Sequence, residues 1–335
     1  MNVKKAQSFI TQNAIYIVLV ILIMGIIVYE PSFMSINTLR DVLIQSSTRV
    51  IIALGVAFIL ITAGTDLSAG RVVGFTAVIS ASMLQIPDYS RRFFPDLPQV
   101  HVLLPIAIAI IAGLLCGLVN GIIVSKLNVP PFIATLGTML IVYGVNSLYF
   151  DMDPNQSQPI GGLREDFTKI GSGFIGSGQY SIPYIVIIAI VVAAIVWVLF
   201  NKTKLGKNMY AIGGNMQAAK VSGINVSKNL IYIYAIAGAL YGLAGVLEAA
   251  RTGGATNNYG NMYELDAIAA CVVGGVSTTG GIGTVPGVLV GVIIFTLINY
   301  GLTFIGISPY YQLIIKGLII IAAVSFDMRK YSSKK

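Results

Sequence analysis

The sequence IPYIVIIAIVVAAIVWVLF, residues 182–200, contains nineteen consecutive residues without a charge. A helix needs roughly 20 mostly apolar residues to cross the hydrocarbon core of a bilayer. The stretch therefore predicts a membrane-spanning helix centred near Val191. The basic residues Lys202 and Lys204 follow it directly.

The composition of the whole chain agrees with this stretch. Of its 335 residues, 56% are hydrophobic and only 10% are charged, and the mean hydropathy is +0.84. A soluble domain carries about 25% charged residues, and a disordered chain combines low hydrophobicity with high charge. Both classes are excluded, and a polytopic membrane protein remains.

Ten apolar blocks can be counted, which predicts an all-α, polytopic membrane protein with about ten transmembrane helices in a single domain, residues 1–335. Two neighbouring pairs are divided only by short polar or Gly-rich hinges at 62–70 and 274–283, so each pair can also be read as one broken helix. The block centres lie near Val20, Ala53, Thr76, Ala112, Met139, Val191, Ala239, Ala270, Val292 and Ile320.

The basic residues that flank the blocks predict the orientation, because cytoplasmic loops carry an excess of Lys and Arg. A cytoplasmic N-terminus puts about twice as many basic residues inside as outside. Both ends carry basic clusters, which favours an even number of spans and a cytoplasmic C-terminus. The residues expected inside are Lys4, Lys5, Arg71, Lys126, Lys202, Lys204, Lys207, Lys220, Lys228, Arg329, Lys330, Lys334 and Lys335.

Two polar segments are long enough to have a role of their own. Residues 151–181, rich in Gly, Pro and Ser, are expected to form an external loop. Residues 201–229 carry five lysines and are expected to be cytoplasmic. Within them, Asn215 is a good N-cap and Gly223 a good C′ residue, which predicts a helix of about seven residues between the two. So short a helix needs a docking surface, although an ordinary capped connection explains it equally well.

Acidic residues near the apolar blocks allow two interpretations. Asp66, in the first hinge, is suited to capping the helix that follows it, and it could alternatively line a broken-helix substrate route. Glu264 and Asp266 lie with Glu248 and Arg251 around the expected external end of the seventh and eighth spans, with Asn257 and Asn258 between. Arg251 can pair with Glu248 or with an acid across the loop, or the group can form a polar entrance for a hydrophilic solute. Arg49 and Lys316 can snorkel.

Other chemistry finds no support in the sequence. The Walker pattern is absent, and the glycines of 274–287 are better explained by close helix packing or a turn than by a phosphate loop. Cys116 and Cys271 are read as small hydrophobes, and no His/Cys cluster predicts a metal. We therefore expect no catalytic residue, cofactor or metal. Basic residues lie between apolar blocks rather than on one face, so no nucleic-acid binding is expected.

Four motifs resemble those of permease subunits from bacterial sugar ATP-binding-cassette (ABC) importers, the ribose, arabinose, xylose and galactose group. They are GTDLSAGR (64–71), VPPFIATLGT (129–138), GKNMYAIGGNMQAAKVSGINV (206–226) and YELDAIAACVVGGVSTTGGIGTVPG (263–287). The resemblance covers nearly the whole chain and keeps the order of the motifs. Residues 255–277 and 298–317 resemble the galactose/methyl-galactoside branch in particular.

The resemblance implies a homodimer in the lipid of the bacterial inner (plasma) membrane. It also implies an extracytoplasmic sugar-binding protein that delivers the substrate and a cytoplasmic ABC ATPase with two nucleotide-binding halves. The short internal helix would then be the coupling helix that docks into the ATPase. Its residues would be Asn215, Met216, Gln217, Ala218, Ala219, Lys220, Val221, Ser222 and Gly223.

We expect the translocation path to be lined by Asp66, Asn257, Asn258, Glu264 and Asp266. Three rival classes remain: an ion-coupled secondary transporter, a permease of the related branched-chain amino-acid importers, and a membrane-embedded enzyme. A secondary transporter needs coupling acids near the bilayer midplane, whereas the acids here are expected at span ends. The resemblance of the C-terminal half to sugar permeases argues against the second class, and no catalytic constellation supports the third.

Overall fold

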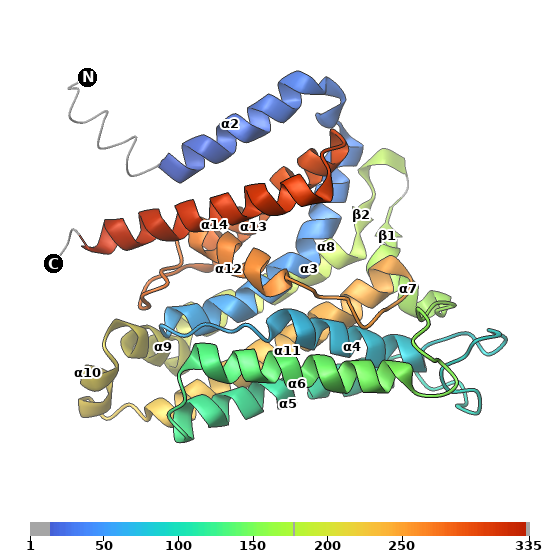
Figure 1. Ribbon diagram of the computed structural model, residues 1–335, viewed down its shortest axis with the longest axis horizontal. Helices are drawn as coiled ribbons and strands as arrows, with labels where there is room; N and C mark the ends of the chain where they lie inside the picture. The colour runs from blue at the N-terminus through green and yellow to red at the C-terminus, as the bar shows by residue number, and fades with distance from the viewer. Residues whose placement is uncertain (1–13, 177, 333–335) are drawn as a thin grey trace.

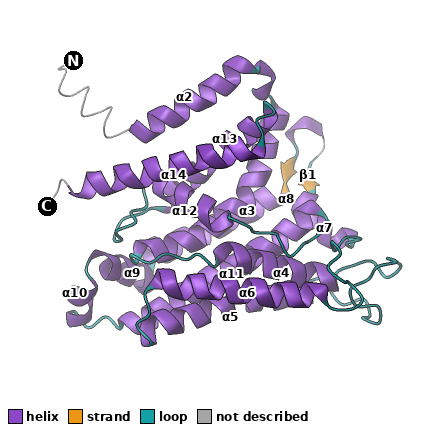
Figure 2. Cartoon of the chain, viewed as in Figure 1, coloured by secondary structure: helices purple, strands orange, loops and turns teal. Residues whose placement is uncertain are grey.

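A computed structural model of the protein describes residues 14–176 and 178–332. Lys4, Lys5, Lys334 and Lys335, expected to be cytoplasmic, lie outside the described residues. The helices form a single bundle, and the described strands form one small hairpin (Figures 1 and 2). The α-helices are α2 (Ala14–Tyr29), α3 (Ile36–Ile61), α4 (Ala69–Met83), α5 (Leu103–Lys126), α6 (Pro131–Asp151), α7 (Glu165–Ser172), α8 (Tyr184–Lys202), α9 (Lys204–Gly214), α10 (Met216–Val221), α11 (Val226–Thr252), α12 (Tyr263–Val273), α13 (Val285–Phe304) and α14 (Pro309–Ser332).

The smaller elements lie in the connections. Two 3₁₀ turns, η1 (Pro31–Phe33) and η2 (Gly178–Tyr180), separate longer elements. The strands β1 (Phe174–Ile175) and β2 (Ile182–Pro183) pair antiparallel, with Phe174 opposite Pro183. α7, η2 and β1 lie in the segment 151–181, and β2 follows it directly; this part of the chain lies at the opposite end of the bundle from α9 and α10 (Figure 1).

Each of the ten predicted block centres falls within a helix, so the helical character of the blocks is confirmed. Six described helices are long and apolar enough to cross a membrane: α3, α5, α6, α8, α11 and α13. α4 has 15 residues and α12 has 11. At 1.5 Å per residue these two are shorter than the ~30 Å hydrocarbon core. The structure thus supports a polytopic all-α membrane protein with interrupted segments.

Both predicted hinges separate helices: residues 62–68 lie between α3 and α4, and residues 274–284 lie between α12 and α13. After α3 ends at Ile61, beside α9, residues 62–68 lead into the bundle as an irregular segment of turns and bends before α4 begins (Figure 1). A second irregular segment, residues 253–262, leads from the end of α11 to the start of α12. Gly70 and Gly74 of α4 lie so close to the backbone of Tyr259 and Gly260 that no Cβ would fit between them. The starts of α4 and α12 therefore meet inside the bundle.

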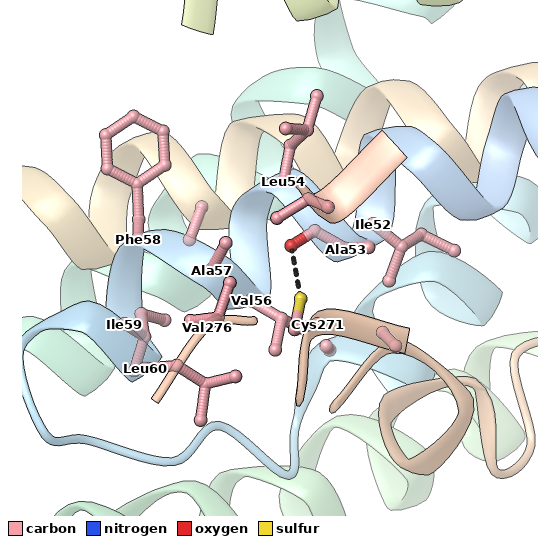
Figure 3. Packing of buried hydrophobic residues seen from close by; sticks show 14 of the residues in the cluster. Ile52, Ala53, Leu54, Val56, Ala57, Phe58, Ile59, Leu60, Cys271 and Val276 are labelled. Atoms are coloured by element: carbon pink, nitrogen blue, oxygen red, sulfur yellow. Dashed lines mark hydrogen bonds between the residues drawn. The ribbon is translucent and has the colours of Figure 1, made fainter. Parts of the chain in front are cut away.

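The core is formed around α3 and α11. Residues 51–61 of α3 are almost completely buried, each at most 1% exposed. Figure 3 shows part of this packing, in which the Cys271 thiol of α12 donates a hydrogen bond of 3.2 Å to the Ala53 carbonyl oxygen. α11 packs against α5 through small residues: a Cβ added at Gly117 or at Gly238 would collide with the backbone of the other helix. Close backbone approach of this kind is how membrane helices associate when lipid removes the hydrophobic driving force.

The Gly117 contact can be tested by adding one methyl group. We expect Gly117→Ala to cost about 1–3 kcal/mol by overpacking and to lower the melting temperature of the purified protein in detergent. Gly137→Ala on α6 is the matched control, since no atom lies within 4 Å of a Cβ added there. Equal melting temperatures for the two variants would contradict the tight α5–α11 contact.

Candidate translocation site and coupling segment

A cluster of charged side chains lies inside the helix bundle. Asp266 in the first turn of α12 is 3.1 Å from Lys316 Nζ of α14 and 3.9 Å from Arg49 Nη1 of α3. Arg49 stands near the middle of a helix long enough to cross a membrane. Ionisable groups at such depth are costly, so they are paired and usually mark a functional pathway.

The same cluster borders a cavity of about 90 Å³ between α3, α12, α13 and α14. On α3 the lining residues Gln45, Arg49 and Ile52 follow helical spacing, as do Val292, Phe295, Thr296 and Asn299 on α13. One face of each helix is therefore turned toward the cavity.

A second polar group is continuous with the first. The Arg251 guanidinium donates a hydrogen bond of 2.7 Å to Glu248 Oε1, which confirms the predicted pair. The Tyr263 hydroxyl donates to the same oxygen over 3.2 Å. The Arg49 guanidinium stacks on the Tyr263 ring, 3.3 Å from its centroid. Charges on α11, α12 and α3 are thus connected through one aromatic side chain.

The start of α4 brings further residues of the predicted path together. The Arg71 guanidinium donates to Asn261 Oδ1 over 2.7 Å and to Asn258 Oδ1 over 3.5 Å. Glu264 is buried against the start of α4, where a Cβ on Gly70 would collide with its carboxylate. Asn257 is turned toward α6, with its side-chain amide 3.5 Å from the Ser147 hydroxyl.

These contacts correct one prediction from the charge pattern. Arg71 was expected in a cytoplasmic loop and Asn258 at the external side, yet the two are in contact. The expectation was wrong because it assumed that α4 starts at a membrane surface. Because 62–68 is an irregular segment that leads into the bundle, the start of α4 meets residues 253–262, and Arg71 lies beside Asn258 and Asn261 rather than in a separate cytoplasmic loop.

Asp66 belongs to a different, buried network. Its Oδ1 accepts hydrogen bonds from the Ser68 backbone amide (2.8 Å) and hydroxyl (2.6 Å). The Asn120 amide of α5 donates to the Ser68 hydroxyl over 2.9 Å, and the Thr138 hydroxyl of α6 donates to Asn120 Oδ1 over 2.6 Å. Asp66 therefore stabilises the turn into α4 and, through Ser68, ties it to two neighbouring helices. The capping interpretation is not confirmed in its strict form, because the N-cap Ser68 forms no side-chain cap hydrogen bond and the two bonds to Asp66 come from Ser68 rather than from the first turn of α4.

The short helix of the segment 201–229 is α10, six residues long. The Asn215 side chain caps its start by accepting a hydrogen bond of 2.9 Å from the Ala218 amide. Gly223, with φ +82°, ends the helix. The Gly223 amide donates to the Lys220 carbonyl oxygen, and the Ile224 amide donates to the Ala219 carbonyl oxygen, each over 3.0 Å. This paired bonding is the Schellman motif, so both predicted caps are confirmed.

The exposed face of α10 differs from the predicted one. Ala219 was expected on a shallow docking face with Met216 and Gly223, but it is 4% exposed and packs into the protein's own core. Val221, in contrast, is 91% exposed. The remaining residues from 215 to 223 are exposed as well. The exposed surface of α10 therefore includes Val221 and excludes Ala219.

α9 links α10 to the interior. The Tyr210 hydroxyl of α9 donates a hydrogen bond of 2.8 Å to the Gly283 carbonyl oxygen in the loop 274–284. In the same loop, the Gly281 amide donates a hydrogen bond of 2.8 Å to the Ile61 carbonyl oxygen at the end of α3. A Cβ on Gly213 of α9 would collide with the Ile61 carbonyl oxygen. The loop 274–284, which leads back to α12, is therefore clamped between α9 and α3.

Sequence reasoning missed the partners of Asp266. Arg49 and Lys316 were read as snorkelling side chains, and Tyr263 received no role. Their depth in apolar blocks was a usable signal, since charges there are normally paired. No spacing rule relates residues 49, 266 and 316, which only the packing of α3, α12 and α14 brings together. Among the described residues, no group of three His, Cys, Asp or Glu side chains could hold a metal ion.

Comparison with known proteins identifies the class. A family model described as the permease component of a branched-chain amino acid transport system matches residues 38–324. The chain belongs to this family of transport permeases, and it is accordingly a multi-pass protein of the bacterial inner (plasma) membrane.

Individual relatives are more specific. The galactose/methyl galactoside import permease protein of Escherichia coli is 53% identical over 335 residues, which cover 100% of this chain and 99% of the relative. The protein of the same name from Haemophilus influenzae is 56% identical over 99% of this chain and 98% of its own. A ribose import permease protein of Haemophilus influenzae is 38% identical, covering 95% of this chain and 94% of its own. No solved structure matches the chain.

The Asp266–Lys316 pair can be tested by removing one charge. We expect Lys316→Met to lower stability by about 1–3 kcal/mol, less than for a fully buried pair because the two side chains are 24% and 16% exposed. Asp266→Asn combined with Lys316→Met should recover part of that loss in a double-mutant cycle of melting temperatures.

The control is an ion pair outside the spans. Lys169 donates a hydrogen bond to Glu165 and so lowers the pKa of that carboxyl, but both side chains are largely exposed. Exposed pairs contribute little to stability, so Lys169→Met should leave the melting temperature unchanged. Additive losses at Asp266 and Lys316 would show that the two charges are not coupled.

Proposed function

We propose that the chain is the permease subunit of an ABC importer and forms the membrane path for a monosaccharide, galactose or methyl galactoside. The observation that carries the proposal is the identity of 53–56% over essentially the whole chain with permeases of that name. The ribose permeases are less similar, at 37–38%, which makes ribose the second candidate among sugars.

The proposal includes the partners that such a subunit needs. The chain has no enzymatic activity of its own. A cytoplasmic ATPase with two nucleotide-binding halves supplies energy, and an extracytoplasmic binding protein supplies the sugar. Two copies of the chain form the membrane unit, an expectation that rests on the family resemblance. Residues 1–335 act as one permease domain, with 151–181 external and 201–229 facing the ATPase.

We propose ten crossings with both termini in the cytoplasm. In this arrangement two of the crossings are interrupted. One consists of residues 62–68 followed by α4, and the other of residues 253–262 followed by α12. The arrangement is supported by the position of α9 and α10 on the same side of the bundle as the start of α2 and the end of α14 (Figure 1). It is also supported by the excess of Lys and Arg on that side.

The contacts of α9 suggest how ATP binding reaches the path. When the ATPase closes, it moves α10, which is covalently continuous with α9. Because α9 holds both the end of α3 and the loop 274–284, the displacement is transferred to α3 and α12. These two helices carry Arg49 and Asp266. The ATPase shifts the permease only through its different affinity for the two states.

Of the predicted path residues, Asp266 is the one that we propose to contact the solute directly, since it borders a cavity. Glu264, Asn257 and Asn258 hold the irregular segment 253–262 against α4 and α6, and so position α12. Asp66 holds the turn into α4 and acts at a distance from the solute.

Reconstitution tests the function. Nanodiscs should contain the chain, its ATPase and its binding protein, and ATP hydrolysis should be measured with galactose, ribose and no sugar. Stimulation by galactose is expected, and the mass of the complex gives the number of permease copies. Solute movement by the isolated chain along an ion gradient, without association of the ATPase, would overturn the proposal in favour of a secondary transporter.

The C-cap of α10 provides a sharper test of coupling. Gly223→Val should place a β-branched residue at φ +82°, which costs roughly 1–3 kcal/mol, and should distort the docking helix. Sugar-stimulated hydrolysis should then fall at least several-fold. Gly223→Asn is the control, because Asn tolerates left-handed geometry. Normal stimulation in Gly223→Val at equal membrane levels would contradict the coupling role.

Substitutions at the adjacent glycines Gly213 and Gly214 can distinguish the transmission of movement through α9 from the binding of the ATPase. Gly213→Ala should displace α9 from Ile61 and Gly281, whereas Gly214→Ala meets no atom within 4 Å. We expect Gly213→Ala to bind the ATPase but to lose most sugar import, with Gly214→Ala near wild type. Import assays and co-purification of the ATPase measure the two effects. Equal import by both variants would exclude this transmission route.

A further inference from the structure

We propose that the cavity bordered by Arg49, Asp266 and Lys316 is a sugar-binding site within each permease subunit, at which one pyranose is held during its passage. The inference rests on the proposed function and adds to it a location, a set of contacts and a selectivity role for the membrane subunit itself.

The first argument is the presence of hydrogen-bonding groups without partners. Within the described part of the chain, the side chains of Gln45, Thr296 and Asn299 line the cavity from α3 and α13 and form no hydrogen bond. Arg49 Nη1, which borders the same cavity, is fully buried without a hydrogen-bond partner. A buried polar group that stays unpaired costs roughly 1–3 kcal/mol. These groups on two walls of the cavity leave hydrogen-bonding capacity for a polar ligand or water.

The second argument is the match to a sugar. Each hydroxyl of a pyranose both donates and accepts hydrogen bonds. The Asp266 carboxylate accepts, Lys316 and Arg49 donate, and the Gln45 and Asn299 amides do both. The rings of Tyr263 and Phe295 border the same cavity and offer apolar surfaces for the C–H faces of the sugar. Few polar groups placed among aromatic ones are typical of small-molecule sites.

Two larger grooves in the described part of the bundle lack these features. A groove of about 440 Å³ between α3, α8 and α13, and one of about 540 Å³ between α5, α8 and α11, are lined almost entirely by apolar side chains. They fit lipid tails or neighbouring helices and offer few partners for hydroxyl groups. The cavity at Asp266 is the polar one of the three.

The size of the cavity adds a conformational requirement. Its volume of about 90 Å³ is below the roughly 300–1,000 Å³ of ligand pockets and holds only a few water molecules. A sugar enters only when its walls separate. α3 and α12 form two of these walls, and they are the helices that α9 reaches through Ile61 and the loop 274–284. Opening is thereby linked to the ATPase.

The test is protection of a cysteine by sugar. Asn299→Cys is made in a Cys116→Ala background, and the complex with ATPase and binding protein is placed in nanodiscs. The rate of modification by a small thiol reagent is measured with and without ATP, in the presence of galactose or inorganic phosphate. We expect galactose to slow modification about two- to ten-fold in at least one nucleotide state.

Val290→Cys on the same helix is the matched control, because Val290 is 51% exposed and does not line the cavity. Galactose should leave its modification rate unchanged. If Asn299→Cys does not assemble, Thr296→Cys takes its place. Slowing by phosphate but not by galactose would identify an anion site and overturn the inference.

The failures of the two proposals are distinguishable. If the complex imports galactose but neither cysteine in the cavity is protected in any nucleotide state, the inference is wrong and the proposed function stands. If no sugar stimulates hydrolysis or import, the proposed function itself fails. Asn299→Leu provides an independent readout. It should raise the KM for galactose import, because a sugar hydroxyl that bonds the Asn299 amide would lose its hydrogen-bond partner.

Discussion

A charge in the hydrocarbon core of a bilayer is stable only with a partner, and this constraint organises the interior of the protein. Arg49 stands midway along α3, where translocon-based scales assign an isolated Arg about +2.5–3.5 kcal/mol. Asp266 and the Tyr263 ring offset that cost from one side. Asp266 also binds Lys316, so one carboxylate on the short helix α12 holds α3 and α14 in place.

The interrupted helices follow from the same constraint. Backbone groups without helical partners are tolerated at membrane depth only when protein surrounds them. In the segment 62–68, the Leu67 amide and the Thr65 carbonyl oxygen bond the Thr135 hydroxyl, and the Ser68 amide bonds Asp66. In 253–262, the Ala255 backbone pairs with that of Ile160, and the Asn257 carbonyl oxygen accepts from the Asn146 amide. Both half-helices begin where these irregular segments meet. The protein thus concentrates polar side chains at the positions where its helices are broken, which is where a hydrophilic solute can be accommodated.

The contacts at the α9 end connect this interior with a surface. α10 is exposed on nearly every side, whereas α9 is held by backbone contacts with α3 and the loop 274–284. Backbone-to-backbone contact through glycine leaves little room for independent movement, because packed interiors transmit strain rather than absorb it. Through α9 and the loop 274–284, α10 is thus connected to α12 over a short route.

The sequence by itself determined the class of protein, the ten helical blocks and both caps of α10, because hydropathy, Asn215 and Gly223 act over a few neighbouring residues. It also predicted the Glu248–Arg251 pair, which lies within one turn of α11. It misplaced Arg71 and Ala219, whose surroundings depend on segments far away in the chain. Only the tertiary structure decided that Arg49, Asp266 and Lys316 meet, because the packing of three helices separated by up to 267 positions sets their distances.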